Sequence, residues 1–224
     1  MSLKKIIQVA ALCGGLIGFG GGASASVITF NNVNDTGAIL YSTTRDGATL
    51  SAIMQFTLSA ISNNSATFAL TVANNSSGPG SNRLMSFGID TVSPTLTGAS
   101  ATGSWDAGIN QNLPSFQTVD LCIWRSNNCS GGNINNGLGE GLSDIFSLIL
   151  TTAGNFTNGI SFTSPYGVKF QDVGTAGNSY EFAGCIVGSP GCGPTPRQVI
   201  PEPASIALVG LGLLGIALGR RRRA

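Results

Sequence analysis

The sequence predicts an all-β protein body, an antiparallel β-sandwich or jelly roll, between two terminal apolar segments. Three observations support this. Several short segments alternate apolar and polar residues, as half-buried strands do. Loops rich in Gly and Asn, such as 74–80 and 131–137, separate these segments. Outside the terminal segments, no stretch of ten residues shows the 3.6-residue period of an amphipathic helix. Many short strands joined by such turns are typical of sandwiches and jelly rolls.

The clearest strand pattern covers residues 50–60, where the even positions are apolar. A polar turn at 62–65 and a second alternation over 66–72 complete a predicted hairpin with one buried face. Half-buried strands are also predicted at 85–89 and 119–123. The remaining predicted strands are 145–150, an apolar run typical of a core strand and interrupted only by Ser147, and the shorter 168–170 and 180–182.

The first 25 residues have the three parts of a secretory signal peptide. Lys4 and Lys5 precede an apolar run over 6–19, and a stretch of small residues ends at Ala25. The Ala-Ser-Ala sequence predicts cleavage after Ala25 by a signal peptidase, following export through the Sec translocon. A permanent anchor is the alternative, but the apolar run is short for a membrane span.

At the other end, residues 204–219 contain no charged side chain and are followed by Arg220, Arg221, Arg222 and Arg223. As a helix this segment would be about 24 Å long, slightly shorter than a hydrocarbon core of ~30 Å. We therefore predict a single transmembrane helix, with the arginines as a cytoplasmic stop-transfer signal and the body outside the inner membrane. Nucleic-acid binding by the arginines is disfavoured, because basic tails that bind nucleic acid do not adjoin an apolar span.

Pro201, Glu202 and Pro203 stand directly before this predicted helix. The order Pro-Glu-Pro, short Gly-rich apolar helix and terminal arginines resembles the PEP-CTERM sorting signal. The resemblance implies that an exosortase recognises Pro201, Glu202 and Pro203, removes the helix and arginines, and passes the protein to the cell surface. It also implies a Gram-negative host that makes exopolysaccharide. A simple anchor with a proline stalk is the alternative. The predicted division is signal peptide 1–25, body 26–196 and sorting signal 197–224.

Four cysteines remain in the body, as two pairs with the same six-residue gap. They are Cys122, Cys129, Cys185 and Cys192. An exported protein meets an oxidising environment, so disulfides are expected; four cysteines allow three connectivities. The turn-like sequences inside each gap favour the two local pairs. A zinc site is disfavoured, because the gaps are wider than usual zinc spacings.

The cysteine region suggests a narrower resemblance. Residues 120–122, 128–132 and 168–171 are similar to the cistern subgroup of PEP-CTERM proteins. This resemblance implies no activity, because no catalytic residues come with it.

Composition excludes several classes of function. The 224 residues include no histidine, which removes Ser-His-Asp triads, Cys-His pairs and histidine zinc sites. A formal net charge of +1 provides no basic field for nucleic acid. We expect no cofactor, no metal and no nucleic-acid partner.

The leading functional hypothesis is a noncatalytic surface or matrix protein associated with exopolysaccharide in a biofilm. The alternative is a carbohydrate-binding module. Its sugar-stacking residue would be Trp105, which lies in the polar loop 103–106. Trp124 is expected to pack on a disulfide; the other aromatic candidates are Tyr166 and Tyr180. A glycoside hydrolase is less favoured, although such an enzyme needs two carboxylates and four acids are available. These are Asp106, Asp120, Glu140 and Asp144.

Overall fold

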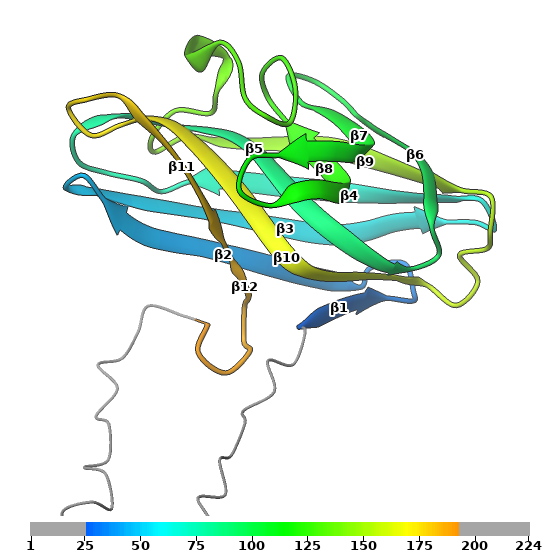
Figure 1. Ribbon diagram of the computed structural model, residues 1–224. Helices are drawn as coiled ribbons and strands as arrows, with labels where there is room; N and C mark the ends of the chain where they lie inside the picture. The colour runs from blue at the N-terminus through cyan, green and yellow to red at the C-terminus, as the bar shows by residue number, and fades with distance from the viewer. Residues whose placement is uncertain (1–25, 193–224) are drawn as a thin grey trace, which may run out of the picture.

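The computed structural model describes residues 26–192, which form two antiparallel six-stranded sheets (Figure 1). The all-β prediction is confirmed. Several predictions lie outside the described residues: the signal peptide and its cleavage after Ala25, the sorting residues 201–203, the transmembrane helix 204–219 and the arginines 220–223. Within the described range, no helix is long and apolar enough to cross a membrane.

The first sheet, sheet A, has the strand order β1-β10-β5-β8-β7, with β11 also paired to β10. The second, sheet B, has the order β12-β2-β3-β4-β9-β6. The strands of sheet A are β1 (Val27–Phe30), β5 (Gly80–Ser93), β7 (Asp106–Leu113), β8 (Gln117–Trp124), β10 (Ile160–Val173) and β11 (Asn178–Ala183). Those of sheet B are β2 (Thr36–Arg45), β3 (Ala48–Ile61), β4 (Ser65–Asn74), β6 (Leu96–Ala101), β9 (Ser143–Thr152) and β12 (Cys185–Ile186). A 3-10 turn, η1 (Ile134–Asn136), lies between β8 and β9.

Strands β3 and β4 form the predicted hairpin. Their apolar alternation places one row of side chains in the core, and the turn at 62–65 closes through a hydrogen bond from Ser62 N to Ser65 O. The inward residues of β3 are fully buried: Leu50, Ala52, Met54, Phe56 and Leu58. The jelly-roll topology is not confirmed, because β2, β3 and β4 are consecutive neighbours in one sheet.

Strand β9 confirms the strand predicted at 145–150 but not its burial on both faces. Phe146, Leu148 and Leu150 point into the core, whereas Ile145 is 73% and Ile149 37% exposed. This apolar run, interrupted only by Ser147, therefore contributes alternate side chains to the core and to the outer face of sheet B, as successive residues of a strand must.

The centre of the core is a cluster of phenylalanines that joins the two sheets. Phe30 and Phe162 come from sheet A, and Phe56 and Phe68 come from sheet B. Their ring centroids lie 5.0–6.1 Å apart, and all four side chains are fully buried. These separations fall in the range of favourable aromatic pairs. The sandwich is thus held by direct aromatic contact between its sheets.

Candidate functional site

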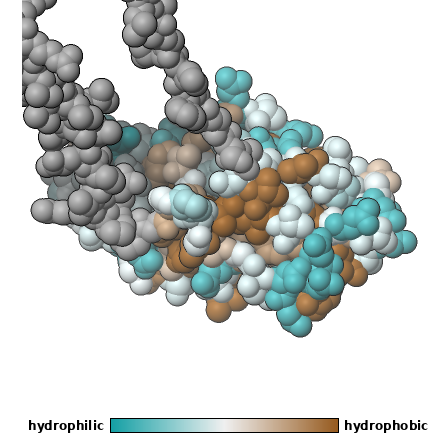
Figure 2. Space-filling view, turned by 90° about the horizontal axis from the view of Figure 1, so that it is seen from below, coloured by the Kyte–Doolittle hydropathy of each residue, from teal (hydrophilic) through white to brown (hydrophobic). Residues whose placement is uncertain are grey.

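The end of the folded body is fixed to the edge of sheet B. Cys185 and Ile186 of β12 pair with Leu40 and Ile39 of β2, and Val187 N donates to Ala38 O at 2.9 Å. The disulfide Cys185–Cys192 closes this segment. In Figure 1, β1 and β12 lie on the same lower side, where Figure 2 shows apolar side chains beside hydrophilic ones. The described chain therefore starts and ends on one side of the sandwich.

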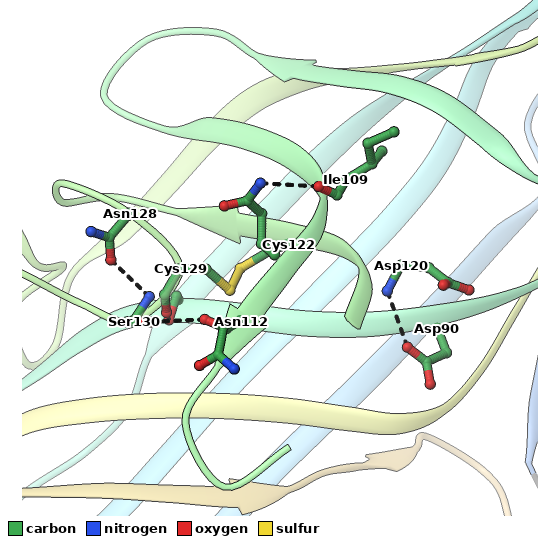
Figure 3. The surroundings of a disulfide bond; sticks show 10 residues. Asp90, Ile109, Asn112, Asp120, Cys122, Asn128, Cys129 and Ser130 are labelled. Carbon is green, nitrogen blue, oxygen red and sulfur yellow. Dashed lines mark hydrogen bonds between the residues drawn. A yellow bond between two sulfur atoms is a disulfide. The ribbon is translucent and has the colours of Figure 1, made fainter. Parts of the chain in front are cut away.

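The second disulfide, Cys122–Cys129, is buried beneath the loop that follows β8. It packs in a small separate core with Leu113 and Val119, and half-buried Trp124 lies against this cluster. In Figure 3 Ser130 Oγ donates to Asn112 O at 2.8 Å, which ties the loop to β7. Both local pairings are thereby confirmed, and so is the packing of Trp124 on the disulfide cluster.

The two disulfides close loops of equal length, so they allow a controlled comparison. Removing either by a double Cys→Ser change should cost about 2–3 kcal/mol if chain entropy alone acts. We expect the Cys122/Cys129 variant to lose more than the Cys185/Cys192 variant, because only the first pair is buried in an apolar cluster. Urea unfolding of both variants measures this difference. A loss at Cys122/Cys129 equal to or below that at Cys185/Cys192 would contradict a contribution from burial.

The structure corrects the prediction for Trp105. This side chain is only 3% exposed, although its neighbours in the 103–106 loop are polar. Its ring is stacked between Phe87 of sheet A and Phe146 of sheet B, with centroid distances of 5.9 and 5.0 Å. Its Nε1 donates to Asp144 Oδ2 at 3.1 Å. Because both faces of the indole are covered, Trp105 is not available to stack on a sugar in this conformation.

The two tyrosine candidates differ in accessibility. Tyr166 is 1% exposed, and its hydroxyl lies 2.8 and 2.9 Å from the carbonyl oxygens of Ser26 and Phe162. Burial raises the pKa of Tyr166 to about 12. Tyr180 is half-buried: its hydroxyl donates to Asp46 at 2.7 Å, and the Arg45 guanidinium lies 5.9 Å from its ring centroid. The hydrogen bond to Asp46 raises the pKa of Tyr180.

Each of the four acids considered for hydrolysis accepts a hydrogen bond from the protein. Asp106 accepts from Ala107 N, Asp120 from Thr91 N, Glu140 from Asn82 Nδ2 and Asp144 from Trp105 Nε1. All four carboxylates are therefore hydrogen-bonded within the described fold.

One further acid, Asp90, lies beside Asp120. Asp90 Oδ1 accepts from Asp120 N at 3.2 Å (Figure 3), and burial is the main cause that raises the pKa of Asp90. Among residues 26–192 no group of three or more acidic or cysteine side chains could hold a metal ion.

Sequence reasoning missed a polar pocket beside the η1 loop. Its volume is about 580 Å³, and it is lined by Arg83 of β5, Arg125 after β8, and neighbouring Ser and Asn residues. In sequence these residues are separate, without a recognisable motif. Only the pairing of β5 with β8 brings the two arginines to one place.

Comparison with known proteins concerns the C-terminus. The model of the PEP-CTERM protein-sorting motif matches residues 199–223, so the motif begins seven residues after Cys192. No curated protein and no solved structure matches the chain. The match does not extend to the cysteine region, and the cistern resemblance is not confirmed. Residues 199–223 carry a PEP-CTERM sorting motif, which indicates an exported, membrane-anchored precursor and implies processing by an exosortase.

Proposed function

We propose that this chain is a noncatalytic protein of the cell surface or extracellular matrix of a Gram-negative bacterium, associated with exopolysaccharide in a biofilm. The observation that carries this proposal is the sorting motif placed directly after a folded β-body. Cleavage after Ala25 would release the body outside the inner membrane, and exosortase processing near Pro203 would separate it from the span. Two disulfides suit such an oxidising location.

A carbohydrate-binding module is the second candidate function. Trp105 no longer supports it, but the pocket lined by Arg83 and Arg125 does, because its polar lining suits a hydroxylated ligand. The two candidates are compatible: a matrix protein can associate with its polymer through such a pocket. They differ in whether binding to the saccharide is the protein's main task.

Sorting is tested by the intact mass of the protein isolated from its own host, with and without the exosortase. We expect a species that begins at Ser26 and ends near Pro203, and that disappears when the exosortase is deleted. Glu202→Ala should block this processing, whereas the control Gln198→Ala, just outside the matched residues, should leave it unchanged. A wild-type mass that still includes Arg220 to Arg223 would refute sorting and indicate a permanent anchor.

Polymer association needs its own measurement. The protein should cosediment with exopolysaccharide purified from the same host, and should remain soluble with a neutral dextran of similar size. Equal sedimentation with both polymers, or with neither, would contradict a specific association while leaving the sorting result intact.

A further inference from the structure

The pocket beside η1 is formed by four separate segments of the chain. Arg83 comes from β5, Arg125 and Ser126 follow β8, and Ser104 lies between β6 and β7. The fourth side is the η1 loop, which rises above the sheets in Figure 1. The lining is almost entirely polar: two guanidinium groups, two hydroxyls and the side chains of Asn135 and Asn136. Its volume of about 580 Å³ is in the range of small-molecule sites, about 300–1,000 Å³.

The two guanidiniums have more hydrogen-bond donors than the described protein uses. Each arginine carries five N–H donors. Between them, the only hydrogen bond to described residues is from Arg83 Nη1 to Gly137 O, at 3.4 Å. The Nε atoms of Arg83 and Arg125 are buried and form no hydrogen bond within residues 26–192, although Arg125 Nε lies 3.5 Å from Asp144 Oδ2. Apart from that hydrogen bond and the contact with Asp144, the guanidinium donors have no partner among the described residues, which leaves the terminal nitrogens available to an acceptor in the pocket.

The position of Arg83 is fixed by the loop that follows η1. Leu84, its neighbour in β5, exchanges backbone hydrogen bonds with Leu138 at 3.0 and 2.9 Å. A Cβ at Gly139 would lie 2.9 Å from Arg83 Nη1, and one at Gly137 would lie 2.9 Å from Arg83 Cβ. The glycines therefore allow the arginine to lie close against the loop. A side chain fixed in this way loses little conformational freedom when a ligand binds.

Nearby carboxylates offset only part of the positive charge that the two arginines bring to this pocket. Asp144 forms an ion pair with Arg125, with Oδ2 and Nε 3.5 Å apart, and that same oxygen accepts from Trp105. Glu140 accepts from Asn82. Among residues 26–192, Arg83 forms no ion pair. The described body contains nine acidic and four basic residues, so two of its four cations lie at one pocket of an otherwise acidic domain.

We propose that this pocket binds the carboxylate of an acidic sugar, a uronic acid unit of a polysaccharide. Planar guanidiniums recognise carboxylates through paired, charge-assisted hydrogen bonds. The hydroxyls of Ser104 and Ser126 and the amides of Asn135 and Asn136 are suited to the hydroxyl groups of a sugar ring. The inference deepens the proposed association with exopolysaccharide and rests on it for the biological source of the sugar. It assigns the carbohydrate-binding role to arginines rather than to an exposed aromatic residue.

The test is calorimetric titration of the full chain in a polyoxyethylene detergent, which contains no sugar. The probes are D-glucuronate, its neutral counterpart D-glucose, and acetate as a carboxylate without a ring. We expect D-glucuronate to bind roughly tenfold or more tightly than either other probe. Arg83→Gln should weaken D-glucuronate binding by roughly tenfold or more. Arg45→Gln removes the same charge outside the pocket and should leave binding unchanged.

A measurement on the unaltered protein covers the case in which Arg83→Gln does not fold. On addition of D-glucuronate, the ¹⁵N–¹H signals of the Arg83 and Arg125 Nε groups should shift, whereas that of Arg45 should not. Acetate binding as tightly as D-glucuronate would overturn the assignment to a sugar. Absent binding, or unchanged affinity in folded Arg83→Gln, would overturn the site itself. Either failure can occur while cosedimentation with the host polymer persists, so it is distinguishable from failure of the proposed function.

Discussion

Replacing Phe162 by alanine is expected to lower the free energy of unfolding by about 3–5 kcal/mol. Phe162 is fully buried and lies 5.3–5.6 Å, between ring centroids, from Phe30, Phe56 and Phe68. Its removal leaves a cavity between the two sheets, and three aromatic partners lose a contact at once. Since domains are typically stable by only 5–15 kcal/mol, this is a large fraction of the total.

Urea unfolding of matched variants checks this expectation. Phe162→Leu retains most of the buried volume and should lose clearly less stability, which keeps the comparison possible if the alanine variant does not fold. Phe182→Ala is the control for a phenylalanine outside the central cluster, because its ring is only half-buried and its aromatic partner among residues 26–192 is Phe170. Equal losses for Phe162→Ala and Phe182→Ala would contradict a central role of the cluster.

The strands that could be predicted are those whose burial follows a local pattern. Strand β3 alternates over 48–58, where its inward positions are apolar without exception; the pattern ends at the register shift after Leu58, and Ala60 is exposed. Strand β7 could not be found in this way, because its sequence, DAGINQNL, has almost no apolar alternation. It is an edge strand that is held by its hydrogen bonds to β8. Strand β12 has two residues and exists only through its pairing with β2. Pairing with a strand far away in the sequence, as for β12, leaves little signal in the sequence.

The functional features show the same distinction between those that are local in the sequence and those that form only in the folded protein. The sorting motif is contiguous, and its order of residues was sufficient to predict what the family match then supported. The disulfides were also local, since each pair is separated by seven positions. The arginine pocket is different: Arg125 N donates to Met85 O, so the end of β8 lies beside β5 only in the folded sheet. Its two arginines carry no common spacing, and no sequence signal would have joined them.

Trp105 shows how a local polar context can mislead. Gly103 and Ser104 are exposed, as is Asp106, so the surrounding sequence has the composition of a surface loop. The indole nevertheless enters the space between the sheets, where Phe87 and Phe146 cover its two faces. The polar atom of the ring explains why this position suits a loop edge: Nε1 reaches Asp144, which also pairs with Arg125. A buried tryptophan of this kind usually finds such a partner.

Trp105→Ala is therefore expected to destabilise the protein by about 3–5 kcal/mol rather than to abolish sugar binding directly. The substitution removes both stacking contacts and leaves the buried side of Asp144 without its indole donor. Trp105→Phe retains an aromatic ring but not the N–H, so it should lower the free energy of unfolding by less, about 1–3 kcal/mol.

Urea unfolding gives the stability of both variants. Cosedimentation with the host polysaccharide, at a temperature where both variants are folded, measures binding. A Trp105→Ala variant with unchanged stability and lost polysaccharide binding would contradict the buried role and favour an exposed stacking residue. We expect the opposite result: the Trp105→Ala variant loses stability, but its folded fraction still binds the polysaccharide. That result would show that the saccharide is recognised away from the indole.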